Sequence, residues 1–149
     1  MRLTSMSFAE GGEIPKRFTP DGGNVSPPLA WTGVPINAQS LALVVDDPDA
    51  PGGTFTHWII VDLPPTVSEL AEGVTKLPGG RLGVNDYKRS EWSGPAPPHG
   101  RHHYVFKLYA LDRGLGLARP TKKELEAAMA GHVLAETRLT ATYQRTKAA

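Results

Sequence analysis

The sequence contains no cysteine, which excludes disulfides, thiolate nucleophiles, zinc–thiolate sites and iron–sulfur clusters. It also has no apolar run long enough to span a bilayer or to form the core of a secretory signal. We therefore expect a soluble cytoplasmic protein with no stable membrane insertion. Lys and Arg are scattered and the formal net charge is +1, so the sequence predicts no nucleic-acid partner.

Motifs of several enzyme classes are missing as well. The chain has no Gly-x-Gly-x-x-Gly and no Gly-x4-Gly-Lys-Ser/Thr, so it predicts no nucleotide phosphate loop. No serine lies in a Gly-x-Ser-x-Gly context, which leaves serine hydrolysis unsupported. We expect no cofactor.

What remains is the composition of one globular domain over residues 1–149. Hydrophobic residues make up 40% and charged residues 21%, a balance that can bury a core. The 14 prolines and 16 glycines indicate many turns and irregular loops.

Three segments have the pattern of good strands. Residues 40–45 are continuously apolar, as expected for a strand buried on both faces. Residues 54–63 and 102–111 alternate, which puts His57 on the face of Ile59 and Val61 in the first and His102 on the face of Tyr104 in the second. Weaker strand signals occur near the N-terminus, and these cover residues 3–8, 14–18 and 30–31.

The C-terminal part changes character. Thr121 and Glu124 form a capping-box pattern, which predicts that a helix begins there. Ala135, Leu139 and Tyr143 recur at spacings of four and predict a second helix over residues 133–145. The sequence therefore predicts a mainly β, sandwich-like domain of antiparallel sheets with peripheral C-terminal helices.

Ionisable side chains gather at the ends of the three predicted strands. Asp46, Asp47 and Asp49 follow the first strand, and His57 lies near the start of the second. His102 and Tyr104 open the third. If these strands are neighbours, their shared edge is too polar for a core unless the groups satisfy one another.

Several kinds of site would use this set. A pair of histidines beside a loop could hold an anion, two histidines with a carboxylate could hold a divalent metal, and a carboxylate–histidine pair could perform acid–base chemistry. A purely structural network is the remaining reading, with Asp47 bonded to loop amides and His57 a satisfied, half-buried histidine. Asp46 is interpreted as a surface charge at a strand end.

Together these residues resemble the phosphatidylethanolamine-binding protein family, in particular its compact bacterial branch, often labelled Raf-kinase-inhibitor-like. The resemblance rests on the segments Asp47-Pro-Asp-Ala-Pro51, His57, Gly94-Pro-x-Pro-Pro98, His102-x-Tyr104 and Gly23-Asn24-x-Ser26-Pro27-Pro28-Leu29-x-Trp31. It covers nearly the whole chain and implies a β-sandwich-like fold with a small anion pocket at one end.

The resemblance also implies which residues form that pocket. They are Asp47, Asp49, Ala50, Pro51, Phe55, His57, Gly94, Pro97, Pro98, His102 and Tyr104. The chain departs from the family pattern at His103, where arginine is usual, and at Ala96, where bacterial members often have cysteine. The alternation turns His103 away from His102.

We therefore expect a non-catalytic protein that binds a phosphate, a phosphoethanolamine-like headgroup or a carboxylate. The carboxylate of Asp47 would repel an anion, so Asp47 is expected to orient a histidine, although a ligand ammonium could use it directly. The alternatives are a metal-dependent or acid–base hydrolase using the same pocket, and a kinase-inhibitor-like module with an unknown protein partner. The resemblance also implies a homodimer.

Overall fold

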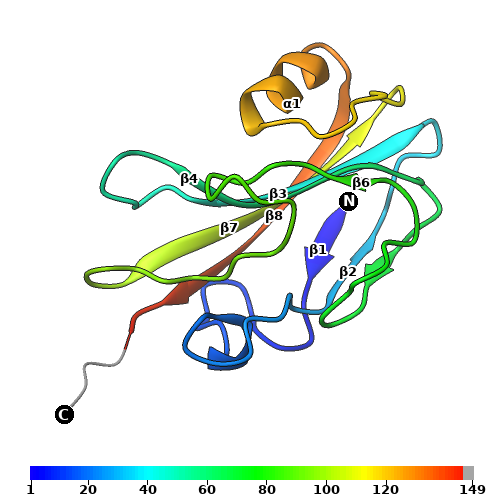
Figure 1. The fold of residues 1–149 in the computed structure, drawn as a ribbon. Coiled ribbons are helices and arrows are strands. Elements are labelled where there is room, and N and C mark those ends of the chain that lie inside the picture. The colour runs from blue at the N-terminus through cyan, green and yellow to red at the C-terminus, as the bar shows by residue number, and fades with distance from the viewer. Residues whose placement is uncertain (146–149) are drawn as a thin grey trace.

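Two antiparallel sheets form the body of the chain in the computed structural model, which describes residues 1–145 (Figure 1). The larger sheet has the order β6-β4-β3-β7-β8, with bounds Arg81–Leu82, Phe55–Leu63, Ser40–Asp47, His102–Leu111 and Val133–Tyr143. The smaller sheet has the order β1-β2-β5, with bounds Arg2–Thr4, Leu29–Thr32 and Glu69–Leu70. These sheets confirm the predicted mainly β, sandwich-like fold.

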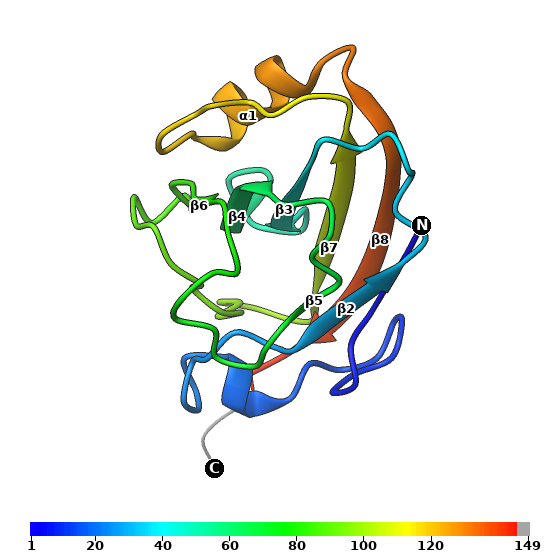
Figure 2. The ribbon, with the colours of Figure 1, turned by 90° about the vertical axis from the view of Figure 1, so that its right-hand side faces the viewer.

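The core has two parts because the central strand is covered on both faces. Every residue of β3 is buried. Val45 and Phe106 belong to the larger cluster between the two sheets, and Val44 belongs to a smaller cluster that includes Leu125 of α1, Lys122–Met129. Figures 1 and 2 show α1 and the smaller sheet on opposite sides of the larger one.

A β-bulge interrupts the alternation along β4. His57 has no partner on β3, and the pairing register shifts beside it. Trp58 packs in the core between the sheets, and the ring of His57 lies 5.4 Å from that of Tyr104, which belongs to the same core. The predicted shared face of His57 with Ile59 and Val61 is wrong, because those two side chains pack beneath α1.

Asp46 is buried, so its interpretation as a surface charge is wrong. The residue is 1% exposed, and its Oδ1 accepts a hydrogen bond of 2.8 Å from the Thr56 hydroxyl. Its Oδ2 lies 3.1 Å from Nζ of Lys107 and 2.8 Å from Nζ of Lys122. Because Lys122 is the first residue of α1, this cluster ties the helix to the sheet.

The second predicted C-terminal helix is wrong, because residues 133–143 form strand β8. This strand pairs with β7 along its length, from His102 opposite Tyr143 to Leu111 opposite Val133. Ala135, Leu139 and Tyr143 are four residues apart, which suggested one face of a helix. Because four is an even number, a strand also places them on one face. The first helix is confirmed as α1, with the capping box formed by Thr121.

The N-terminal strand predictions are only partly confirmed. β1 ends at Thr4, short of the predicted residue 8, and β2 confirms the strand at residues 30–31. Residues 14–18 contain no strand: Lys16–Phe18 is a 3₁₀ turn, and Phe18 donates its N–H to the carbonyl of Pro15. Proline has no backbone N–H for a sheet ladder, which explains the difference.

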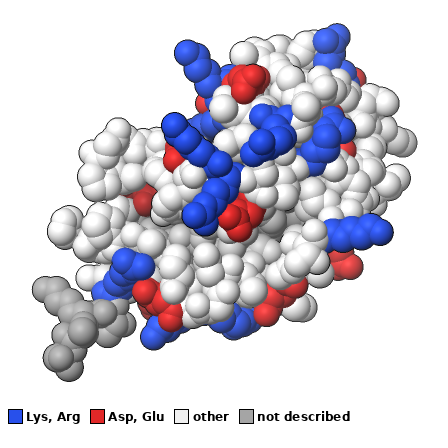
Figure 3. Space-filling view, viewed as in Figure 1, with Lys and Arg blue, Asp and Glu red and all other residues white. Residues whose placement is uncertain are grey.

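Two surface properties bear on function. Within residues 1–145, no helix has the length and apolar character needed to cross a membrane. On the face drawn in Figure 3, acidic and basic side chains are interspersed, and no extended region has one sign of charge.

The buried cluster around Asp46 predicts a measurable loss of stability. Asp46→Asn keeps the side-chain shape but leaves Lys107 and Lys122 partly buried without their counter-charge. We expect the free energy of unfolding to fall by about 1–3 kcal/mol in urea titrations followed by circular dichroism. Asp112→Asn is the matched control, since Asp112 pairs with His132 at the surface and should change the value by no more than about 0.5 kcal/mol. Equal stability of the two variants would contradict the assignment.

Candidate functional site

A cavity of about 180 Å³ lies where β3 ends and β4 and β7 begin. Antiparallel pairing brings these three strand ends together at one end of the sheet. The cavity is lined by Asp47, Ala50, Pro51, Phe55, His57, Tyr87, Ala96, Pro97, Pro98, His102 and Tyr104. Two residues that the sequence assigned to the pocket, Asp49 and Gly94, do not line it.

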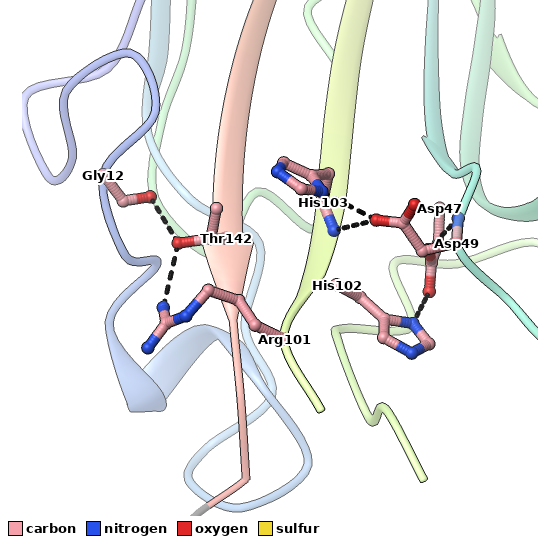
Figure 4. A network of polar contacts seen from close by, with 7 residues as sticks. All are labelled: Gly12, Asp47, Asp49, Arg101, His102, His103 and Thr142. Atoms are coloured by element: carbon pink, nitrogen blue, oxygen red, sulfur yellow. Dashed lines mark hydrogen bonds and ion pairs between the residues drawn. The ribbon is translucent and has the colours of Figure 1, made fainter. Parts of the chain in front are cut away.

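Asp47 holds the ring of His102 in place. Its Oδ2 accepts a hydrogen bond of 2.6 Å from Nδ1 of His102, and the two side chains are 5% and 8% exposed (Figure 4). Its Oδ1 accepts the backbone N–H of Asp49 at 2.8 Å. Because a carboxylate is the acceptor, Nδ1 of His102 carries the proton, and Nε2 has no hydrogen-bond partner among residues 1–145.

His57 is held in the same manner by a backbone carbonyl. Its Nδ1 donates to the carbonyl oxygen of Ser93 at 2.5 Å. Burial lowers the pKa of His57, and the hydrogen bond to Ser93 and the nearby charge of Asp47 offset this only in part. The ring is therefore neutral at neutral pH, with an acceptor lone pair at Nε2.

Tyr104 carries an unpartnered polar atom. Its hydroxyl is the one buried side-chain oxygen or nitrogen of the described chain, residues 1–145, that makes no hydrogen bond of normal geometry, although it lies near the carboxylate of Asp47. The residue is 1% exposed. Burial, with the nearby carboxylate of Asp47 as a second cause, raises the pKa of Tyr104 well above its ordinary value. The hydroxyl thus stays protonated and can donate to a ligand.

An aromatic wall closes one side of the cavity. The rings of Phe55 and Tyr87 meet edge to face at 4.7 Å, and the ring of Phe55 lies 5.1 Å from that of His57. Tyr87 was not predicted, because it lies in the aperiodic stretch 66–91, which contains only the short strands β5 and β6 and carries no motif.

Asn85 organises the loop that presents Tyr87, and it was also missed from the sequence. The residue is 3% exposed, and its Oδ1 accepts the backbone N–H groups of Tyr87 and Arg89. Its Nδ2 donates to the carbonyl of His57 and to the hydroxyl of Ser93, each at 3.1 Å. One buried amide therefore ties the loop to β4 beside the cavity.

Asp49 and His103 form a second carboxylate–histidine pair, which lies outside the cavity (Figure 4). Oδ2 of Asp49 accepts from the backbone N–H of His103 at 2.8 Å and from its Nδ1 at 2.7 Å. These hydrogen bonds lower the pKa of Asp49. The predicted orientation of His103, away from His102, is confirmed, since His102 reaches Asp47 at the end of β3 and His103 reaches Asp49 in the loop that follows.

Gly94 does not line the cavity either, and its contacts are structural. Its N–H donates to Oδ1 of Asn24 at 2.9 Å, and its Cα lies against the carbonyl of Phe18 so closely that a side chain would collide. Glycine is required here by space and not by its conformation.

The described residues do not favour a metal centre. Within residues 1–145, no group of three or more His, Asp or Glu side chains is arranged to hold a metal ion. His57 and His102 each commit one ring nitrogen to the protein, and Asp47 is bonded to His102.

Comparisons with known proteins agree on one family. A family model described as phosphatidylethanolamine-binding protein matches residues 4–144. A UPF0098 protein of Methanothermobacter thermautotrophicus is 49% identical over 151 residues, which cover 97% of this chain and 99% of that protein. A solved Chlamydia trachomatis chain, described as a phosphatidylethanolamine-binding protein homolog, matches with a TM-score of 0.93 and 40% identity over 97% of each chain. Escherichia coli YbcL, described as a member of the mammalian family, matches at 0.89 and 29% over 97% and 98% of the two chains.

The lowered pKa of His57 predicts a pH-dependent stability. Between the folded pKa and the ordinary value of 6.5, the unfolded chain binds more protons, so the free energy of unfolding rises with pH. The stability associated with neutral His57 is complete above about pH 6.5 and is lost as the pH falls toward the folded pKa. NMR titration should give His57 a midpoint below the ordinary histidine value of 6.5.

One variant isolates this contribution. His57→Gln should flatten the pH dependence of the melting temperature below about pH 6.5 relative to the wild type. A His57 midpoint at or above the ordinary histidine value would contradict the assignment.

Proposed function

Because the chain belongs to the phosphatidylethanolamine-binding protein family, we propose that its cavity binds a small anionic group, without catalysis. The ligand class is a phosphate, a phosphoethanolamine-like headgroup or a carboxylate. The groups that would contact it are Nε2 of His57, Nε2 of His102 and the hydroxyl of Tyr104. The single observation that carries the proposal is the buried, unpartnered hydroxyl of Tyr104.

An unpartnered hydroxyl favours a ligand at this place. Leaving a buried polar group without a hydrogen bond costs about 1–3 kcal/mol. A ligand oxygen would accept from Tyr104 and remove that cost. The Nε2 atoms of His57 and His102 also have no hydrogen-bond partner among residues 1–145. Neither is sealed from solvent, since the hydroxyl of Tyr104 is the one side-chain polar atom of these residues that is both inaccessible and unpartnered.

The carboxylate of Asp47 is compatible with an anion because its oxygens are occupied. One accepts from the backbone of Asp49 and the other from the ring of His102. Asp47 therefore acts on the ligand through His102, whose ring it orients.

The size of the cavity also fits a headgroup. Pockets for drug-sized ligands measure about 300–1,000 Å³. The cavity here, about 180 Å³, suits a phosphate or a short carboxylate more than a larger molecule.

One observation favours a second candidate function, acid–base hydrolysis. A histidine that donates Nδ1–H to a buried aspartate and leaves Nε2 free has the arrangement of a general base, as Asp47 and His102 do. No Ser, Thr, Cys or Lys of the described chain lines the cavity, and the reaction considered is attack by a water that His102 deprotonates. Turnover of a phosphoester or carboxylic ester panel that disappears in His102→Gln would establish this function in place of the first.

Tyr104→Phe tests the anion site directly. Removing one hydrogen bond to a charged acceptor should weaken binding of phosphate and phosphoethanolamine about 10- to 100-fold in calorimetric titrations. His103→Gln is the matched control, since it removes a neighbouring histidine outside the cavity and should keep wild-type affinity. The absence of NMR shifts at His57 and His102 up to millimolar ligand would rule the proposal out.

The affinity for sulfate should depend on pH. Sulfate keeps its double charge and offers only hydrogen-bond acceptors. Neutral His57 also presents an acceptor at Nε2, so the two cannot form a hydrogen bond. As the pH falls from about 8 to about 5, protonation of His57 turns Nε2 into a charged donor, and affinity should rise. In His57→Gln this rise should be smaller than in wild type, and an equal rise in both proteins would exclude His57 as the titrating contact.

A further inference from the structure

A second and larger cavity lies beside the first. Its volume is about 340 Å³, and it is lined by Asn24, Val25, Ser26, Trp58, Gly73, Val74, Thr75, Leu77, Leu82, Ser90, Glu91 and Trp92. Trp58 follows His57 on β4, and Trp92 precedes Ser93, the residue whose carbonyl accepts from His57. The two cavities are thus built on consecutive residues of β4 and on the same segment, residues 83–101, between β6 and β7.

Two buried donors that line this cavity have no acceptor among residues 1–145. The indole N–H groups of Trp31 and Trp92 donate to the carbonyls of Val67 and Phe18, at 2.9 and 3.0 Å. The indole N–H of Trp58 and the hydroxyl of Ser26 make no hydrogen bond to residues 1–145, although the two residues are only 2% and 3% exposed.

Neither of these donors is sealed off in the core. In the described part of the chain, the hydroxyl of Tyr104 is the one side-chain polar atom that is both inaccessible to solvent and unpartnered. The donors of Trp58 and Ser26 are therefore reachable, and the cavity that both residues line gives the access. The pocket therefore presents two free, nearly buried donors to any molecule that enters it.

The charges around the cavity select an uncharged acceptor. No Lys or Arg of residues 1–145 lines it, and Glu91, the one charged lining residue, is acidic. Glu91 pairs at the surface with Arg89, at 3.6 Å, and the lining itself supplies no cation for an anion. The remaining wall is largely apolar, with Trp58 and Trp92 packed edge to face at 5.4 Å.

We propose that this cavity is a second binding site, for an uncharged small molecule with a carbonyl or ether oxygen on an apolar body. The oxygen accepts from Nε1 of Trp58 and Oγ of Ser26, and the body packs against the indole rings and Leu77. The volume falls within the range of about 300–1,000 Å³ that is usual for small-molecule sites. The inference goes beyond the anion site and does not rest on it.

The proposal also gives a role to the segment Asn24-Val25-Ser26-Pro27-Pro28. Asn24 accepts the N–H of Gly94, and the carbonyl of Ser26 accepts the N–H of Gly73 at 2.8 Å. The segment thereby holds the loops that follow β5 and precede β7 around the cavity. None of its residues lines the anion cavity.

NMR of the tryptophan indole N–H signals tests this site, with N,N-dimethylbenzamide as the probe. This molecule has a carbonyl acceptor, no donor and no charge. We expect a saturable shift of the Trp58 signal, which is assigned by its loss in Trp58→Phe, and an unchanged Trp31 signal as the internal control. Ethylbenzene, which lacks the oxygen, should bind more weakly.

Two further variants make the test decisive. Ser26→Ala should weaken probe binding about 2- to 10-fold, the effect of one neutral hydrogen bond. Tyr104→Phe should bind the probe with wild-type affinity, which separates this site from the anion site, and unchanged NMR spectra elsewhere show that each variant is folded. No saturable shift at Trp58 up to the solubility of the probe, equal affinity in Ser26→Ala, or ethylbenzene binding as tightly as the amide would overturn the proposal.

Discussion

The alternation of side chains at the end of β3 is the constraint on which both the Asp46 cluster beneath α1 and the anion cavity beside Asp47 depend. Consecutive strand residues point to opposite faces of a sheet. Asp46 therefore turns toward α1 and Asp47 toward the cavity, so two adjacent carboxylates that look equivalent in the sequence have separate tasks. Shifting β3 by one residue would bring only one of them to the position of the other, and would leave either His102 or the pair Lys107 and Lys122 without its carboxylate. The register of the central strand is thus fixed electrostatically as well as by its apolar residues.

The bulge at His57 is the second such constraint. Regular alternation would have sent His57 to the side of α1, where Ile59 and Val61 pack. The extra residue lets His57 and Trp58 face the same side of the sheet, one at the anion cavity and the next at the larger cavity. Bulges re-aim side chains near functional sites in many sheets, and they persist because the surrounding structure holds them. Here Asn85 binds the carbonyl of His57 and supplies that support.

The sequence predicted best where a local pattern and the tertiary contacts agree. The three central strands and the α1 cap follow from periodicity and spacing, and Asp47, His102 and Tyr104 meet once those strands are neighbours. Periodicity put His57 on the opposite face, and only the family resemblance placed it in the pocket. Strand β8 was mistaken for a helix because a spacing of four fits both structures, and only pairing with β7 decides between them. The bulge, Asn85 and Tyr87 leave no comparable signal, since each depends on contacts with distant segments. The burial of Asp46 was missed for the same reason, because Lys122 is remote in the sequence.

The proposed anion site has a chemical asymmetry that narrows its ligand. Tyr104 keeps its proton throughout the physiological pH range, because burial raises its pKa, and so it offers a donor. His57 is neutral at neutral pH and offers an acceptor, because burial lowers its pKa. A ligand with both a negative oxygen and a hydroxyl, such as hydrogen phosphate, matches this pair as it stands. A fully deprotonated anion would need His57 to become protonated first, at the cost of burying a cation. The site is therefore better matched to partly protonated oxyanions than to anions that only accept.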